Sequence, residues 1–543
     1  MSGCSCGEDS DSADGADADA DTDTDTDVDA DSDADSDSDT EPPPPPDEVC
    51  EAPVQAVDTT APDTVVGDGT AESCTEDAFK GAIATGGVIT FACGADPATI
   101  TLTSEAVIGA DTVIDGGGLV TLSGGGTTRI LNMDTGNFEA TGPLLTVQHL
   151  TFTGGHATGT KFRLGTDVDG GGGAIFYRGG SVTAIDCTFT DNKAAELGPD
   201  VAGGGIYGIG VGETIVVASR FNANRAANGG ALGALHTALT VVNTTIVDNV
   251  ATGNGANYID EGGEQQGQGG NGGAIVMDGV GRTLRICGST ISNNEGGAFG
   301  GAVFRTSYES EPTIVDRSVF DSNRVRDTGE ESSGAGGLYL QGTHVTMTAT
   351  TVSNNEARGF AGLWIMGHGA APGVADLTNV TIANNRTIPR EDFTTRGIGG
   401  GLVIGDNATG TVLNCTIVGN EAQFASGIAR VSPLVVRNTI ISNLADNEWT
   451  PLNCTGSAYA TPPGTGDGNV QWPNGRQDDM DCTEGILRAD PLMGTLGDAG
   501  GPTPTVSPEA GSPAIGLGTD CPETDQRGEP RSEPCTAGAV EVP

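Results

Sequence analysis

The feature that most constrains the fold of this chain is a two-part motif that recurs about nine times. Its front half is a pair of small residues, mostly Gly-Gly, followed within one or two positions by an aliphatic residue. Its back half is an aliphatic residue or Phe, two further residues and then Asn. The front halves begin at Gly172, Gly203, Gly229, Gly272, Gly300, Gly336, Ala361, Gly400 and Ser426. The back halves end at Asn192, Asn224, Asn249, Asn294, Asn323, Asn355, Asn385, Asn420 and Asn443.

Short runs rich in Val, Ile and Thr separate the two halves, and such residues favour the pleated, half-buried surface of a β-strand. Gly accepts a positive φ at corners, and Asn tolerates the left-handed region. A single copy has one apolar face and cannot bury it alone, whereas stacked copies bury it continuously. An uninterrupted copy of about 22 to 28 residues has the length of one coil of a parallel β-helix. The repeat therefore predicts an all-β parallel β-helix of about ten coils.

The repeated Asn column is interpreted as architecture, an internal ladder of side-chain amides that closes each turn. Five residues before each Asn lies a column of small residues that alternation directs inward, which includes Cys187 and Cys415. We expect these two cysteines to be buried core thiols, and Cys287, two residues earlier in its coil, to point inward as well. Asp316 stands where other coils have an aliphatic residue, which indicates either a bulge or shifted register, or a site formed with Arg317.

The net charge of −50 is concentrated at the start of the chain, where nearly every second residue between Glu8 and Glu48 is acidic. Together with the run Pro42–Pro46, this segment cannot bury apolar surface, and residues 1–67 are predicted to form an extended, disordered spacer. Phosphates would be repelled, so nucleic acid is excluded as a partner. No cofactor is expected, although the carboxylates of this segment attract hard cations and make low-affinity Ca²⁺ binding possible.

Six of the 12 cysteines form pairs close in sequence, namely Cys74 with Cys93, Cys454 with Cys482 and Cys521 with Cys535. Local pairs in loop-rich segments indicate disulfides and an oxidising compartment. No run of about 18 apolar residues is present, so no transmembrane helix is expected. The segment Ser2-Gly3-Cys4 resembles the end of a bacterial lipobox, which gives the hypothesis that the true start lies upstream and that Cys4 carries a lipid. A chance cysteine is the alternative.

Two further resemblances follow from longer segments. Gly-Gly-Ala-Ile with Phe-x-x-Asn resembles the repeats of chlamydial polymorphic outer-membrane proteins, which are right-handed parallel β-helix surface proteins implicated in adhesion. The end of the chain, with Asp490-Pro491-Leu492, Gly511-Ser512-Pro513-Ala514-Ile515 and Asp525-Gln526-Arg527-Gly528, is similar to the choice-of-anchor Q family of bacterial extracellular β-helix proteins. That family often carries a C-terminal anchor, and the chain stops at Pro543, which favours attachment near Cys4. The segment after Asp68 resembles an N-terminal cap, with Thr75 capping a short helix.

Enzymes with this fold carry clustered carboxylates, and the sequence shows no such cluster. Gly367-His368-Gly369 matches one motif of polygalacturonases, but the other motifs are missing, and Asp167-Val168-Asp169 supplies too few ligands for Ca²⁺. Alternation instead directs one residue of each front half outward, and three consecutive coils have Phe304, Tyr339 and Trp364 there. An exposed aromatic strip would bind sugar rings or a protein partner; the alternative is a ladder that stabilises an outer sheet face or lies under a loop.

These observations predict three segments: the spacer 1–67, a cap and right-handed parallel β-helix at 68–445, and a disulfide-bonded C-terminal region at 446–543. The expected function is a non-enzymatic module for adhesion or glycan binding, at the bacterial cell surface as an outer-membrane lipoprotein or secreted. Its partner would be a polysaccharide or a component of a host or neighbouring cell surface, and it would touch the membrane through the lipid alone. A polysaccharide lyase or glycoside hydrolase, and a passive component of the cell envelope, are the alternatives.

Overall fold

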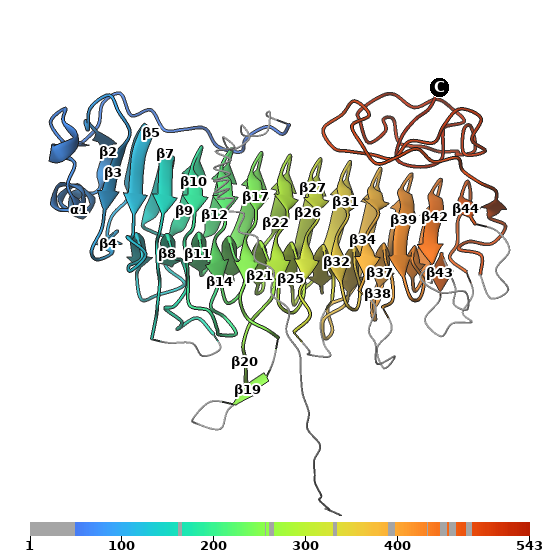
Figure 1. Cartoon of the computed structure of the whole chain (residues 1–543), viewed down its shortest axis with the longest axis horizontal. Coiled ribbons are helices and arrows are strands. Elements are labelled where there is room, and N and C mark those ends of the chain that lie inside the picture. The colour runs from blue at the N-terminus through green and yellow to red at the C-terminus, as the bar shows by residue number, and fades with distance from the viewer. Residues whose placement is uncertain are drawn as a thin grey trace, which may run out of the picture. The chain divides into compact units, whose positions relative to one another are not determined.

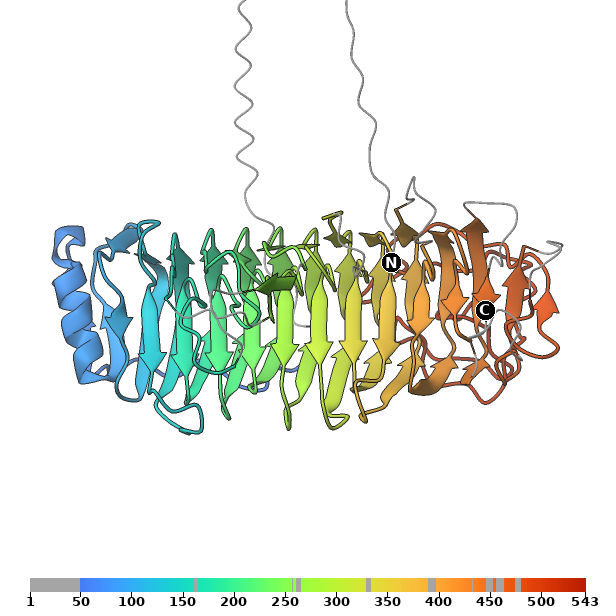
Figure 2. The ribbon, with the colours of Figure 1, turned by 90° about the horizontal axis from the view of Figure 1, so that it is seen from below.

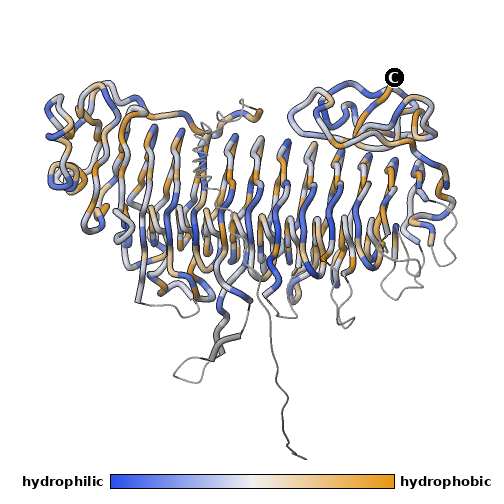
Figure 3. Tube along the Cα trace, viewed as in Figure 1, coloured by the Kyte–Doolittle hydropathy of each residue, from blue (hydrophilic) through white to orange (hydrophobic). Residues whose placement is uncertain are grey.

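The computed structural model describes residues 49–543, apart from residues 161–164, 256, 260–264, 329–333, 389–396, 432, 446–452, 456–462 and 474–479. Nearly every strand pairs in parallel with the strand one coil earlier and one coil later, so the coils stack side by side along one axis (Figure 1). Hydrophobic and hydrophilic residues alternate along the coils, as Figure 3 shows. The fold is the predicted parallel β-helix.

Twelve strands, one per coil, form the sheet that we call sheet B. Their number exceeds the ten or so coils expected because the outermost coils lack the two-part motif. In order they are β4 (Ala106–Val107), β6 (Leu131–Asp134), β8 (Ile175–Arg178), β11 (Ile206–Ile209), β15 (Leu232–Leu235), β21 (Ile275–Asp278), β25 (Val303–Thr306), β29 (Leu338–Gln341), β33 (Leu363–Met366), β37 (Leu402–Ile404), β40 (Ile428–Ala429) and β43 (Cys454–Thr455).

The remaining parallel strands form sheet A, which bends around the other sides of the coils as three ladders. The first ladder contains β1 (Thr64–Val66), β2 (Gly87–Phe91), β5 (Thr112–Ser123), β7 (Leu144–Thr153), β9 (Ser181–Ile185), β12 (Glu213–Val217), β16 (Ala238–Val242), β22 (Leu284–Cys287), β26 (Pro312–Asp316), β30 (His344–Thr348), β34 (Gly373–Thr378), β38 (Ala408–Leu413) and β41 (Leu434–Arg437). The second contains β3 (Ala98–Thr101), then parts of β5 and β7, then β10 (Thr188–Thr190), β13 (Arg220–Asn222), β17 (Thr245–Val247), β23 (Thr290–Ser292), β27 (Val319–Asp321), β31 (Thr351–Ser353), β35 (Thr381–Ala383), β39 (Thr416–Ala422), β42 (Ile440–Ala445), β44 (Val470–Trp472) and β45 (Leu487–Arg488).

The third ladder lies at the corner before sheet B and is made of two-residue strands. They are β14 (Arg225–Ala226), β18 (Val250–Ala251), β24 (Glu295–Gly296), β28 (Arg324–Val325), β32 (Glu356–Ala357) and β36 (Arg386–Thr387). One antiparallel hairpin, β19 (Asn257–Ile259) with β20 (Gln265–Gly267), projects from the coil between β18 and β21 (Figure 1). The last strands of the second ladder, β44 and β45, carry the β-helix on to Arg488, beyond the boundary at residue 445 expected from the repeat.

The predicted asparagine ladder is confirmed. Each ladder Asn donates its side-chain Nδ2 to the Oδ1 of the ladder Asn one coil further on, as Asn294 does to Asn323 over 2.9 Å. That same Oδ1 also accepts the backbone N–H of the earlier Asn, at 3.0 Å from Asn294. The ladder runs without a break from Asn192 to Asn453. The left-handed residue is the one before the ladder Asn, such as Ser322 with φ 56°.

A helix covers the open end of the first coil. Helix α1 (Glu76–Thr85) begins after Thr75, whose hydroxyl accepts the backbone N–H of Ala78 at 3.2 Å. Glu76 and Asp77 lie in its first turn, where the helix dipole favours acidic groups, as the sequence predicted. Phe79, Ala82 and Ile83 are buried, and Figure 2 shows the helix at the end of the stack. The cap thereby shields the apolar interior from water.

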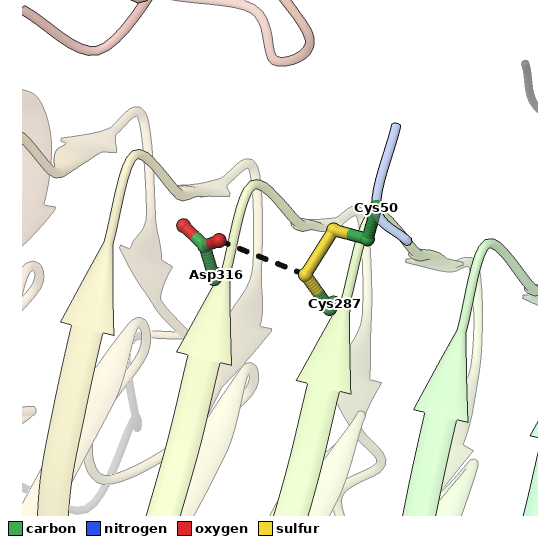
Figure 4. Close-up of side chains that lie close together, drawn as sticks. All are labelled: Cys50, Cys287 and Asp316. Carbon is green, nitrogen blue, oxygen red and sulfur yellow. Dashed lines mark hydrogen bonds between the residues drawn. A yellow bond between two sulfur atoms is a disulfide. The ribbon is translucent and has the colours of Figure 1, made fainter. Parts of the chain in front are cut away.

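Residues 49–63, placed by the sequence in the spacer, instead form a strap along the outside of the first ladder (Figure 1). Val57 exchanges two backbone hydrogen bonds with the side chain of Gln148, and the Thr59 hydroxyl donates to Asp115. A disulfide joins Cys50 to Cys287 (Figure 4). The strap therefore crosses several coils before the chain enters sheet A at β1.

The strap explains two errors of the sequence analysis. Cys287 points outward to the strap, because it pairs in register with the outward residues Val242 and Asp316. Val242 is buried beneath the start of the strap, with Cys50 and Val49. Asp316 occupies the same outward column without any shift of register, one coil beyond that point. Cys187 and Cys415 are buried free thiols, as predicted.

The C-terminal segment, residues 489–543, contains no β-strand and folds back over sheet A near the end of the stack (Figure 1). The Asp-Gln-Arg-Gly motif fastens it. Gln526 bonds to Thr351, Thr381 and Thr503 through its side chain. The fully buried Asp525 carboxylate accepts Arg527 Nε at 2.9 Å and Nη2 at 2.7 Å, as well as the backbone N–H of Glu541. This motif is architectural.

Candidate ligand-binding cavity

The aromatic column lies on the outward side of sheet B, in one register from β8 to β33. Phe304 pairs with Tyr339, and Tyr339 pairs with Trp364. The Phe304 and Tyr339 rings stack at 5.3 Å, and Tyr339 meets Trp364 edge-on at 4.8 Å. The alternation of inward and outward residues along the strands was sufficient to predict this column from the sequence.

The predicted exposure is wrong for Phe304 and Tyr339, and the alternative of a ladder that lies under loops is confirmed for them. Phe304 is 9% exposed and Tyr339 is 7% exposed, because loops before the sheet B strands fold over them. Phe299, from the loop before β25, lies 4.9 Å from Tyr339, and Phe360, from the loop before β33, lies 4.0 Å from Trp364. The aromatic side chains therefore form a second apolar layer rather than a surface strip.

A cavity of about 320 Å³ remains between this layer and the loops. Its floor includes Tyr207, Phe304 and Tyr339, and its walls come from the loops that precede β11, β21 and β25. Trp364 lies outside it and lines a smaller cavity of about 150 Å³ with Phe360 and Arg430. Two of the three predicted aromatic residues thus share one cavity.

Hydrogen bonds hold the walls and floor of this cavity in place. Asn228 donates Nδ2 to the carbonyls of Gly198 and Pro199 and accepts the backbone N–H of Asn271, so it ties two loops together. On the floor, the Tyr339 hydroxyl donates to Gln341 Oε1 at 3.0 Å. The Tyr207 hydroxyl donates to the backbone carbonyl of Asp200. These hydrogen bonds therefore fix the loops and the two tyrosine side chains that line the cavity.

Two carboxylates line the cavity, Asp200 from the loop before β11 and Asp278 at the end of β21. Burial raises the pKa of Asp200 to about 6, which the backbone N–H of Gly165 partly offsets and the negative charge of Asp278 reinforces. Burial also raises the pKa of Asp278, against the opposing effects of Tyr308 and Arg305. Two ionisable groups in one recess that repel each other are characteristic of functional sites.

Two hydrogen-bond acceptors of the cavity lack a donor. Asp278 Oδ1 and Asn271 Oδ1 are buried without a hydrogen-bond partner among the described residues. Buried polar atoms are normally satisfied, and each exception needs an explanation such as a bound group. No Lys or Arg side chain is among the described residues that line the cavity. Sequence reasoning missed Asp200, Asp278 and Asn271, because they lie in loops or at a strand end outside the repeated motif.

The other sequence candidates lie elsewhere. Asp316 and Arg317 form an ion pair at 2.8 Å, and Arg317 donates Nη1 to the Val49 carbonyl. They line a cavity of about 590 Å³ between the start of the strap and the C-terminal segment, where the charged side chains pair with each other. His368 meets Tyr308 edge-on at 4.9 Å. Asp169 accepts the backbone N–H and hydroxyl of Thr160.

The sulfurs of Cys50 and Cys287 lie near a carboxylate oxygen of Asp316, which is 3.6 Å from Cys287 Sγ (Figure 4). Metal ions bind thiolates, and the disulfide leaves none here, so this group does not fit a metal. No other cluster of three metal-ligating side chains was found within the described ranges. The acidic segment, for which Ca²⁺ binding is possible, lies outside the described residues.

Disulfides also join Cys74 to Cys93, Cys454 to Cys482 and Cys521 to Cys535, which are the pairs expected from the sequence. Together with Cys50–Cys287 they indicate an extracellular or secreted protein. In the described part of the chain, no helix is long and apolar enough to cross a membrane. Cys4 lies outside the described residues.

The stacked coils, the capped end and the disulfides define an extracellular parallel β-helix protein with a loop-covered cavity on sheet B. A family model for the right-handed β-helix region matches residues 308–457, which confirms the predicted fold and its hand. The match covers β26 to β43 and so includes Tyr339 and Trp364. A search of curated proteins found no match.

Proposed function

We propose that this protein binds a carbohydrate in the cavity on sheet B. The observation that carries the proposal is the combination of an aromatic floor, Phe304 and Tyr339, with buried acceptors, Asp278 and Asn271, in one recess. The C–H faces of a sugar ring stack on aromatic rings, and its hydroxyls donate to carboxylate and amide oxygens. The volume of about 320 Å³ falls at the lower end of the range for ligand pockets.

Adhesion or glycan capture at a bacterial surface agrees with this site. The disulfides place the protein outside the reducing cytoplasm, and the likeness of the chain's end to the choice-of-anchor Q family favours surface display. Attachment through a lipid on Cys4 belongs to the proposal, and mass spectrometry of the native N-terminus tests it. An unmodified Cys4 in the native protein would contradict the lipid anchor and leave secretion.

The test of carbohydrate binding is a glycan array probed with the full chain, followed by calorimetric titration of the glycans that bind. Asn271→Ala removes one unpaired acceptor from the cavity and should weaken binding about 5- to 20-fold, as the loss of one buried hydrogen bond does. Trp364→Leu is the matched control, since Trp364 belongs to the same column but lies outside the cavity. Absence of any binding glycan, or equal losses in both variants, would refute the proposal.

A glycoside hydrolase is the second candidate, and the pair Asp200 and Asp278 favours it. A carboxyl group with a pKa of about 6 can protonate the leaving oxygen of a glycosidic bond, while a second carboxylate takes a proton from the attacking water. Release of new reducing ends from a panel of polysaccharides, lost in Asp200→Asn, would establish it. Silence across the panel, with binding retained, leaves the non-enzymatic function.

A further inference from the structure

The charges of the cavity restrict its ligand further, provided that the proposed carbohydrate binding holds. The described lining contributes two carboxylates and no Lys or Arg, so a uronic acid or a sulfated sugar would meet repulsion without a counter-charge. Two buried side-chain oxygens lack a partner here, and both accept hydrogen bonds: Asn271 Oδ1, and Asp278 Oδ1 when its carboxyl group is ionised. The ligand must therefore supply donors.

The nearby positive groups leave the acidic character of the cavity intact. Arg305 is fully buried beside Asp278, but its guanidinium donates to the carbonyls of Arg282 and Thr306 at 2.8 and 2.9 Å and lies outside the lining. His236 also lies near Asp278 and, like Arg305, acts to lower the pKa of the Asp278 carboxyl group. Glu311 faces Arg305 from the following turn and adds a negative charge.

The floor of the cavity also suits a cation. The aromatic residues Tyr207, Phe304 and Tyr339 line it, and aromatic rings attract ammonium groups. Burial raises the pKa of Tyr339 to about 12, and burial raises that of Tyr308, beside Asp278, to about 12 as well. Both tyrosines thus stay neutral at any physiological pH and add no negative charge of their own. Among the described residues that line the cavity, the two aspartates are left as the groups that titrate near neutral pH.

We infer that the ligand is an amino sugar with a free, protonated amine, bound with its ring over the aromatic floor and its ammonium group between Asp200 and Asp278. An ammonium group donates three hydrogen bonds and so satisfies the orphaned oxygen of Asp278, and its positive charge offsets one of the two negative charges of the pair. The sugar hydroxyls supply the donor for Asn271. An N-acetylated sugar lacks the charge, and a neutral sugar lacks both the charge and the nitrogen.

The experiment is calorimetric titration of the full chain at about 0.15 M salt with glucosamine disaccharide, its N-acetylated form, a neutral glucose disaccharide and digalacturonate. Disaccharides and salt limit the non-specific attraction of cations to a chain with a net charge of −50. We expect the free-amine sugar to bind roughly tenfold more tightly than the N-acetylated or neutral sugar, and digalacturonate not at all.

Asp278→Asn should abolish this preference, whereas Asp376→Asn, which removes the same charge from an exposed residue paired with His344, should leave it unchanged. The preference should weaken at pH 5, where Asp200 is protonated, and grow towards pH 7. Equal or tighter binding of the uncharged sugars would overturn the inference and leave the proposed function standing. Failure of all four sugars to bind would overturn the inference, while the glycan array decides on the proposed function.

Discussion

Cys50 is bonded to Cys287, which lies 237 residues further along the chain, and the bond fixes the start of the strap to the strand β22. The strap covers aliphatic residues of the first ladder, among them Val242. Without the strap, this outward column would expose apolar surface to water. The disulfide therefore protects a hydrophobic contact that the repeat alone does not provide.

Replacing both cysteines, in Cys50→Ala/Cys287→Ala, should free the start of the strap and lower the free energy of unfolding by about 2 to 4 kcal/mol. Limited proteolysis should then cleave between residues 50 and 57, because that backbone loses its anchor. Cys521→Ala/Cys535→Ala serves as the control, since that bond closes a loop within the C-terminal segment. An uncleaved strap in the first variant would show that the hydrogen bonds of Val57 suffice.

The asparagine ladder should be sensitive to a single deletion. Asn323→Ala leaves the buried backbone N–H of Asn294 without its acceptor, and it removes the Nδ2 donor that Asn323 supplies to the Ile291 carbonyl and to Asn355 Oδ1. A buried polar group left without a partner costs about 1 to 3 kcal/mol, so we expect a loss of about 2 to 5 kcal/mol in urea unfolding. Asn137→Ala, in an exposed loop, should change the free energy by less than about 0.5 kcal/mol. Similar values for the two variants would contradict the ladder.

The C-terminal segment should depend on the pair Asp525 and Arg527. Arg527→Ala leaves the Asp525 carboxylate buried without its counter-charge, a change that typically costs about 3 to 5 kcal/mol. The expected readout is early proteolytic loss of residues 489–543 while the helix stays intact. Arg437→Ala, which breaks exposed pairs with Asp467 and Asp520, should cost at most about 1 kcal/mol. Retention of the segment in Arg527→Ala would assign its attachment to Gln526.

Asp200 should make stability depend on pH in a direction opposite to most aspartates. Its folded pKa of about 6 exceeds the ordinary value of 3.8, so the folded state binds the proton more tightly. The stabilising contribution is complete below about pH 4 and is lost as the pH rises to about 6. Asp200→Asn should therefore be more stable than the wild type at pH 7.5, by about 1 to 3 kcal/mol, and equally stable near pH 4. Thermal unfolding at both pH values checks this, and a constant difference would contradict the raised pKa.

The sequence predicted those features that the repeat or short spacing determines. The Asn ladder, the inward Cys187 and Cys415 and the capped helix after Thr75 each follow from alternation or from a local motif. The bond between Cys50 and Cys287 could not be found, because the partners are distant and Cys50 follows directly on an acidic, proline-rich segment.

In the candidate site, too, the sequence predicted only what the repeat determines. Alternation correctly directed Phe304 and Tyr339 outward from sheet B, but the covering loops differ in length and sequence from coil to coil. Whether an outward residue is exposed depends on those loops, which carry Asp200 and Asn271. No periodic pattern predicts such residues. Their position beside Asp278 depends on the three-dimensional path of two separate loops.

The most direct test of the account is a crystal structure of the full chain with the tightest-binding glycan from the array. We predict a sugar ring over Phe304 and Tyr339, with a donor of the sugar within hydrogen-bonding distance of Asp278 Oδ1. A glycan bound at any other surface, with the sheet B cavity unchanged, would contradict it.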